Sequence, residues 1–241
     1  MGHPAALCVF LVALAAVNTR AQDAERIVPV HQEPRHRMVF EAGSTRILHL
    51  QVQPGDTSLF HTHAEPIVYV VIQTTETQTQ NIGSEWSAAR NQLPFTAPPS
   101  GVFGTTSYVE NPVTHRIRNA GKDVFELIAI LNLSPGEETQ TPETAGFTGK
   151  PEHSNRWFRA YRISVPAGAS VRHEHATPTV LVQTTAGTAL GTGARLFGFN
   201  QPNDWGYFDP REPHQVRNAG KTAVEFIEVE VRQPPGSIRR E

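Results

Sequence analysis

Six histidines form two similar sets that could bind metal ions. His61 and His63 are separated by one residue, and so are His173 and His175. Residues i and i+2 of an extended strand project from the same face about 7 Å apart, so each pair can direct two imidazoles at one point. A histidine later in each half would complete a set of three nitrogen ligands. We therefore predict two divalent-metal sites, formed by His61, His63 and His115 and by His173, His175 and His214.

The two histidine sets lie in similar stretches of sequence, and this similarity is the main support for the predicted metal sites. In a chain of 241 residues with 11 histidines, a single HxH pair can arise by chance. A histidine in a half-polar strand is also often solvated, or hydrogen-bonded in the core, without binding a metal. Here residues 118–122 recur as residues 217–221, with the sequence Arg-Asn-Ala-Gly-Lys, and each copy follows its third histidine by three residues. This indicates an internal repeat, with units at about 36–135 and 155–236.

The first copy is longer than the second, mainly within residues 84–107. This segment contains three prolines and is predicted to be an elongated loop that partly covers the first site. Tyr108 and Tyr207 lie seven residues before the third histidine of their copies, and this matched placement predicts a shared structural role. Tyr69 and Leu181 have the strand parity of the HxH pairs, so they are candidates to line the sites.

The elements that position these residues are predicted to be β-strands. Ile227, Val229 and Val231 alternate with Glu228 and Glu230, which gives a strand with one apolar face. The Asn-Ala-Gly-Lys segments between apolar runs predict short hairpin loops. No long stretch outside the first residues has helical periodicity. We expect an all-β protein of two small antiparallel units, for which either a sandwich or a barrel would be adequate.

The residues around the histidines resemble the motifs of the cupin family. The first copy has Gly55, five intervening residues, His61 and His63, and then His115 with Asn119 four positions later. The second copy is similar, with four residues between its glycine and its first histidine. The resemblance covers nearly the whole chain after the first residues. It implies a bicupin, an all-β protein of two jelly-roll barrels in tandem, each with a metal held inside.

The chain departs from the cupin pattern at the carboxylate ligand. Cupins usually have a glutamate separated from the HxH pair by three or four residues, and at those positions this chain has Ile67 or Val68 and Thr179 or Val180. We therefore expect both sites to lack a carboxylate ligand. The resemblance then implies only the three histidines of each copy as metal ligands. A divalent ion on three neutral imidazoles keeps its full +2 charge and should attract an anionic oxygen ligand.

The first residues are expected to form a signal peptide. The apolar run of residues 5–17 is too short to cross a bilayer, and small residues precede a plausible cleavage site after Ala21. We expect a signal peptide at 1–21, an N-terminal barrel at 22–135, a linker at 136–154 and a C-terminal barrel at 155–241. The mature protein would be periplasmic or secreted, without membrane attachment. Because Cys8 is the only cysteine, no disulfide would remain.

Composition restricts the partners. Charged residues make up 18% of the chain and its formal net charge is -2, so the electrostatic attraction that drives nucleic-acid binding is missing. We expect a small-molecule ligand or substrate and no nucleic acid. Homodimerisation through strand edges stays open. Histidine-rich sites accept Fe, Mn, Zn, Ni or Cu, and the sequence does not select among them.

Two functions from different classes fit these features. The resemblance includes three-histidine cupin enzymes, among them iron dioxygenases of thiols, diketones and aromatic acids, and it suggests a metal-dependent oxygenase or isomerase acting on a small oxygen-bearing anion. The alternative is a non-catalytic periplasmic module that binds or senses a small ligand or a metal. No general base accompanies either histidine set in the sequence, so the catalytic residues are not identified.

Overall fold

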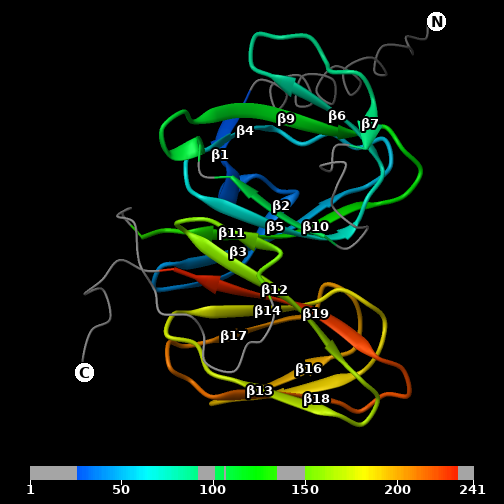
Figure 1. The fold of residues 1–241 in the computed structure, drawn as a ribbon. Coiled ribbons are helices and arrows are strands. Elements are labelled where there is room, and N and C mark those ends of the chain that lie inside the picture. Colours follow the sequence, from blue (N-terminus) through cyan, green and yellow to red (C-terminus); the bar gives the residue numbers. More distant parts are fainter. Residues whose placement is uncertain (1–25, 92–100, 106, 135–149, 233–241) are drawn as a thin grey trace, which may run out of the picture.

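The computed structural model describes residues 26–91, 101–105, 107–134 and 150–232. Within these residues the regular structure is β-strand, apart from two single-turn 3-10 helices, η1 (Val30–Gln32) and η2 (Ser107–Val109). The strands form two barrels stacked on each other (Figure 1). The predicted all-β fold with two barrels is confirmed. None of the described segments is a helix long and apolar enough to cross a membrane.

In the described residues, the first barrel consists of two five-stranded sheets. Its outer sheet has the order β1 (Ile27–Pro29), β4 (Phe60–His63), β9 (Val113–Asn119), β6 (Glu76–Asn81) and β7 (Arg90–Asn91). Its inner sheet has the order β2 (His36–Ala42), β3 (Thr45–Val52), β10 (Phe125–Asn132), β5 (Ile67–Gln73) and β8 (Val102–Thr105). Neighbouring strands are antiparallel except β1 and β4, which are parallel.

The second barrel repeats this arrangement with a smaller outer sheet. Its inner sheet has the order β11 (His153–Ser154), β12 (Phe158–Val165), β19 (Val224–Val231), β14 (Thr179–Gln183) and β17 (Trp205–Phe208). Its outer sheet has the order β13 (Ser170–His173), β18 (His214–Asn218), β15 (Ala189–Thr192) and β16 (Leu196–Phe199). All of these pairs are antiparallel.

The two inner sheets pack face to face and form one apolar layer between the barrels (Figure 1). Ile128 of β10 lies in the same buried cluster as Ile227 and Val229 of β19. The ring centroid of Phe40 lies 4.6 Å from that of Tyr207 across this layer. The inner sheets are therefore covered on both faces, which explains why β5 and β10 are apolar along most of their length.

The predicted alternation of apolar and polar residues in β19 is confirmed, but the apolar face of this strand does not point into its own barrel. Ile227, Val229 and Val231 belong to the layer between the barrels. Glu228 and Glu230 lie on the opposite face and are buried inside the second barrel. Since the apolar face has the other barrel as its partner, polar side chains from β19 are placed in the barrel interior.

The repeated Asn-Ala-Gly-Lys segments do not form hairpins, so that prediction is wrong. They join strands that lie in opposite sheets, such as β9 in the outer sheet and β10 in the inner sheet. Asn119 stabilises this corner, because its Nδ2 donates to the carbonyl oxygens of Val52 and Asp123, both at 2.8 Å. Asn218 makes the corresponding hydrogen bonds in the second barrel. The repeated asparagines thus serve the fold rather than the sites.

Some predicted segments lie outside the described residues. These are the leader at 1–21, most of the linker at 136–154, and residues 92–100 of the long loop. The last linker residues, His153 and Ser154, pair with β12 as strand β11. The remainder of the long loop contains β7 and β8, and β8 pairs with β5 at the edge of the inner sheet.

Candidate functional site

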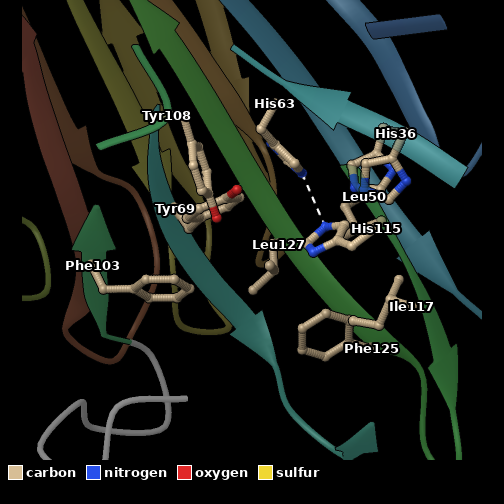
Figure 2. Close-up of a pocket in the computed structure, with 11 residues that line it drawn as sticks. His36, Leu50, His63, Tyr69, Phe103, Tyr108, His115, Ile117, Phe125 and Leu127 are labelled. Atoms are coloured by element: carbon tan, nitrogen blue, oxygen red, sulfur yellow. Dashed lines mark hydrogen bonds between the residues drawn. The ribbon is translucent and has the colours of Figure 1, made fainter. Parts of the chain in front are cut away.

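The three histidines predicted for the first site converge inside the first barrel, and Figure 2 labels two of them, His63 and His115. β4 carries His61 and His63, and the antiparallel register places His61 opposite His115 of β9. Their ring centroids lie 4.7 to 5.0 Å apart, and the Nε2 atoms of His63 and His115 are 3.2 Å apart. The fold therefore brings the predicted set together. Its role in binding a metal stays a prediction.

A fourth histidine, which the sequence did not reveal, joins this cluster. The ring centroid of His36 in β2 lies 4.3 Å from that of His61 and 6.2 Å from that of His63. One ring nitrogen from each of these three histidines lies within 4.8 Å of the others. His36 is far from the HxH pair in sequence, and the described cluster of the second barrel contains no counterpart of His36. No local sequence pattern therefore identifies it as part of the site.

Hydrogen bonds made by Nδ1 direct the Nε2 atoms of His61 and His36 toward a metal-binding role. His61 Nδ1 donates to the carbonyl oxygen of Leu59 at 2.9 Å, and His36 Nδ1 donates to the buried carboxylate of Glu33 at 2.7 Å. With Nδ1 protonated, Nε2 carries the lone pair. His61 Nε2 is buried and has no hydrogen-bond partner among the described residues. A divalent ion would satisfy this nitrogen, so the residues present fit a metal.

Burial keeps His61, His63 and His115 neutral by lowering their pKa values. It is the main cause that lowers the pKa of His61, with further contributions from His36, His115 and His63. Burial and the neighbouring His115 lower the pKa of His63 well below its usual value. Burial, aided by His36, lowers the pKa of His115 to about 4. At pH 7 these imidazoles are therefore in the neutral form that binds metal ions.

A cavity of about 140 Å³ lies beside the first cluster (Figure 2). It is lined by His36, Leu50, His61, His63, Tyr69, Phe103, Tyr108, His115, Ile117, Phe125 and Leu127. Tyr69 of β5 takes part, in agreement with its predicted strand parity. Phe103 of β8, within the long loop, and Tyr108 of η2, just after it, form another part of the wall (Figure 2).

The three histidines of the second predicted set also converge. His173 ends β13 and pairs with His214 of β18, and His175 follows two residues later. Their ring centroids lie 5.4 to 6.1 Å apart inside the second barrel. Both predicted sets are therefore assembled by corresponding strands of the outer sheets, β4 with β9 in the first barrel and β13 with β18 in the second.

A carboxylate lies at the centre of the second cluster, so the expectation that both sites lack one is wrong. Glu228 is fully buried, and its Oε1 lies 2.8 Å from His175 Nε2 and 2.6 Å from His214 Nε2. Its Oε2 accepts from His173 Nδ1 at 2.8 Å. The glutamate is missing from the usual motif position, but β19 supplies another. The four side chains could hold a divalent ion.

The electrostatics of the second cluster are opposite to those of the first. Burial alone would lower the pKa of His175, but its hydrogen bonds to Glu228 and Glu230 raise it to about 9. Burial alone would raise the pKa of Glu228, but hydrogen bonds from the three histidines lower it well below its usual value. Without a metal, an ion pair between His175 and its glutamates therefore stabilises this cluster.

One strand position accounts for much of this difference. Ala129 of β10 pairs with Tyr69, and at the corresponding place in the second barrel Glu228 pairs with Leu181. The first barrel thus has a phenol opposite a methyl group, whereas the second has a leucine opposite a carboxylate. The first cluster adjoins an open cavity, while a negative charge occupies the centre of the second.

Tyr108 and Tyr207 do not share a role, so that prediction is also wrong. The ring centroid of Tyr108 lies 5.0 Å from that of His63, and Tyr108 lines the cavity. Tyr207 lies in β17 and packs against Phe40 between the barrels. Equal spacing from the third histidine does not give equal placement, because η2 precedes that histidine in one copy and β17 precedes it in the other.

Comparison with solved structures identifies the fold. AerE from Microcystis aeruginosa is similar, with a TM-score of 0.54 and 11% identity over 80% of this chain and 90% of that chain. An oxalate decarboxylase has a TM-score of 0.51 and 15% identity over 79% of this chain and 69% of its own. A variant of salicylate 1,2-dioxygenase from Pseudoaminobacter salicylatoxidans has a TM-score of 0.51 and 11% identity over 78% and 70%.

These similarities show that the chain has the bicupin fold, as its histidine motifs predicted. No protein-family model matches the sequence, and no curated protein sequence matches it.

Proposed function

We propose that the protein is a metal-dependent enzyme, an oxygenase or isomerase, that acts on a small oxygen-bearing anion in the first barrel. The observation that carries the proposal is the buried Nε2 of His61, which has no partner in the described structure and adjoins the cavity. The bicupin fold of oxalate decarboxylase and salicylate 1,2-dioxygenase supports the same class of function by analogy.

The predicted ligands of the ion are His61, His63 and His115. The ring nitrogens that lie within 4.8 Å of one another belong to His36, His61 and His63, and His115 Nε2 lies 3.2 Å from His63 Nε2, so His36 is a further candidate ligand. A bound Fe, Mn, Zn, Ni or Cu ion would act as a Lewis acid toward an oxygen ligand. The neutral His61, His63 and His115 would add no negative charge to the ion, which favours an anionic ligand. The cavity wall is largely apolar, and the low dielectric of such surroundings strengthens the attraction between unlike charges.

The second cluster would hold another ion, with Glu228 as a fourth ligand beside His173, His175 and His214. For a four-coordinate ion such as zinc, four protein ligands are typical of a structural site, whereas a catalytic site keeps a position open. We therefore assign catalysis to the first barrel and a stabilising role to the second.

The metal assignment is tested by elemental analysis of natively purified protein. We expect about one ion per barrel, loss of the first ion in His61→Ala and loss of the second in His173→Ala. His31→Ala is the matched control, because His31 lies outside both clusters and contacts Arg46. Unchanged metal content in both cluster variants would refute the proposal.

A non-catalytic binding module is the second candidate. The described residues that line the cavity include no aspartate, glutamate or lysine to act as an acid or base. Oxygen consumption and product analysis with candidate anions separate the two functions. Turnover that is lost in His61→Ala supports the enzyme, whereas retained ligand without turnover supports the binder.

We also propose that the protein is exported. The apolar run at residues 5–17 and the small residues before position 22 support this assignment. Protein recovered from the periplasm or the medium of the native host should begin at Gln22. Recovery of a chain that begins at Met1, in the cytoplasm alone, would contradict it.

A further inference from the structure

Two tyrosine hydroxyls meet at the wall of the first cavity (Figure 2). Tyr69 and Tyr108 both line the cavity, their hydroxyls lie near each other, and the ring centroid of Tyr108 lies 5.0 Å from that of His63. Each hydroxyl has one hydrogen to donate, and a bond between them would use only one of the two. At least one hydroxyl hydrogen therefore remains for a third group. Burial raises the pKa of both phenols, so both stay protonated at neutral pH.

The rest of the wall is apolar and encloses a small volume. It consists of Leu50, Phe103, Ile117, Phe125 and Leu127. The cavity volume of about 140 Å³ is close to that of an engineered apolar cavity of about 150 Å³ that binds benzene. The space thus suits a ligand whose body is about the size of one aromatic ring.

The charge pattern allows one anionic group and disfavours a second. Among the described lining residues there is no lysine or arginine, and the polar groups are the histidines and the two tyrosines. A second carboxylate on the ligand would lie against the apolar wall without a partner, and burying such a charge is costly. The second barrel has a carboxylate of its own at the centre, so it repels anions where the first barrel accepts them.

We propose that the first barrel selects a monoanion with a ring-sized apolar body, and that its oxygen end lies between the histidine cluster and the Tyr69–Tyr108 pair. This inference rests on the proposed metal site of the first barrel and specifies its substrate class. It predicts that a compact dicarboxylate is a poor ligand, in contrast to a simple aromatic or similarly apolar acid.

The test is calorimetric titration of the metal-loaded protein with three probes. Benzoate is the monoanion with a ring, benzamide is its neutral isostere, and succinate is a dianion without a ring. We expect benzoate to bind at least about tenfold more tightly than either of the others, since a hydrogen bond to a charged group is stronger than one to a neutral group. Equal or tighter binding of succinate would overturn the proposal.

The tyrosine pair is tested separately with Tyr108→Phe. This variant should weaken benzoate binding about tenfold or more and affect benzamide less, because the lost hydrogen bond is charge-assisted only for benzoate. Tyr207→Phe is the matched control, since this tyrosine has the same spacing from its histidine but lies outside the cavity. Unchanged benzoate affinity in Tyr108→Phe would exclude the pair as a binding element.

Metal content is measured on the same samples. A wild-type protein that holds no ion in the first barrel would refute the proposed function itself. A protein that holds the ion but shows no preference for benzoate would refute this inference alone.

Discussion

Acidification of the metal-free protein from pH 7 to pH 5 is expected to destabilise the first barrel and leave the second nearly unchanged. His61, His63 and His115 have lowered pKa values in the folded protein, so the unfolded chain binds more protons below pH 6.5. The contribution of these histidines to the free energy of unfolding is complete above that pH and falls as the pH decreases toward their folded pKa values. Each histidine lowers the free energy of unfolding by about 1.4 kcal/mol per pH unit in this range.

The second barrel keeps its stability over this range and loses stability at higher pH instead. The pKa of His175 is raised to about 9, so its contribution is complete below pH 6.5 and is lost as the pH rises through 9. The pKa of Glu228 is lowered, so its contribution is complete above pH 4.5 and is lost in stronger acid. Between pH 5 and pH 6.5 both contributions are present.

Amide hydrogen exchange in the presence of a chelator can measure the two barrels separately. At pH 5, after correction for the intrinsic exchange rate, β4 and β9 should lose protection while β13 and β18 keep it. Above pH 9 the order should reverse. His115→Gln should reduce by about one the number of protons that the first barrel takes up when it unfolds at acid pH. Equal protection of β4 and β9 at pH 7 and pH 5 would contradict the assignment of buried neutral histidines.

Replacement of Glu228 by alanine is expected to destabilise the metal-free protein by about 3–5 kcal/mol, the usual cost of removing one partner from a buried charged network. Glu228 is the common acceptor for three histidines, and its loss removes one acceptor from each of them, while the contact between His175 and Glu230 stays. The variant should also lose the metal of the second barrel, since the fourth ligand is absent.

Urea unfolding and elemental analysis test this prediction together. Glu225→Ala is the matched control on the same strand, because the Glu225 side chain forms a partly exposed ion pair with Arg162 at 3.1 Å. Such pairs contribute about 0–1 kcal/mol. Ala129 occupies the corresponding position in the first barrel, so the backbone accepts a small side chain there. Unchanged stability and metal content in Glu228→Ala would show that the carboxylate is not part of a working centre.

The sequence alone determined the strands, the repeat and the two predicted histidine sets. Strand alternation is a local property, and HxH spacing places two imidazoles on one face wherever the strand lies. The repeated register of His115 and His214 then linked the third member of each set to its pair. These features depend on short-range geometry, which is why they could be recognised without coordinates.

The tertiary structure decided which other side chains reach the histidines. Alternation shows that β19 has two unlike faces, but only the packing of one barrel on the other places Glu228 inside rather than outside. His36 reaches the first cluster from a strand in the opposite sheet, and Tyr108 reaches the cavity where Tyr207 does not. Such contacts join residues distant in sequence, so the path of the whole chain determines them and no local pattern encodes them.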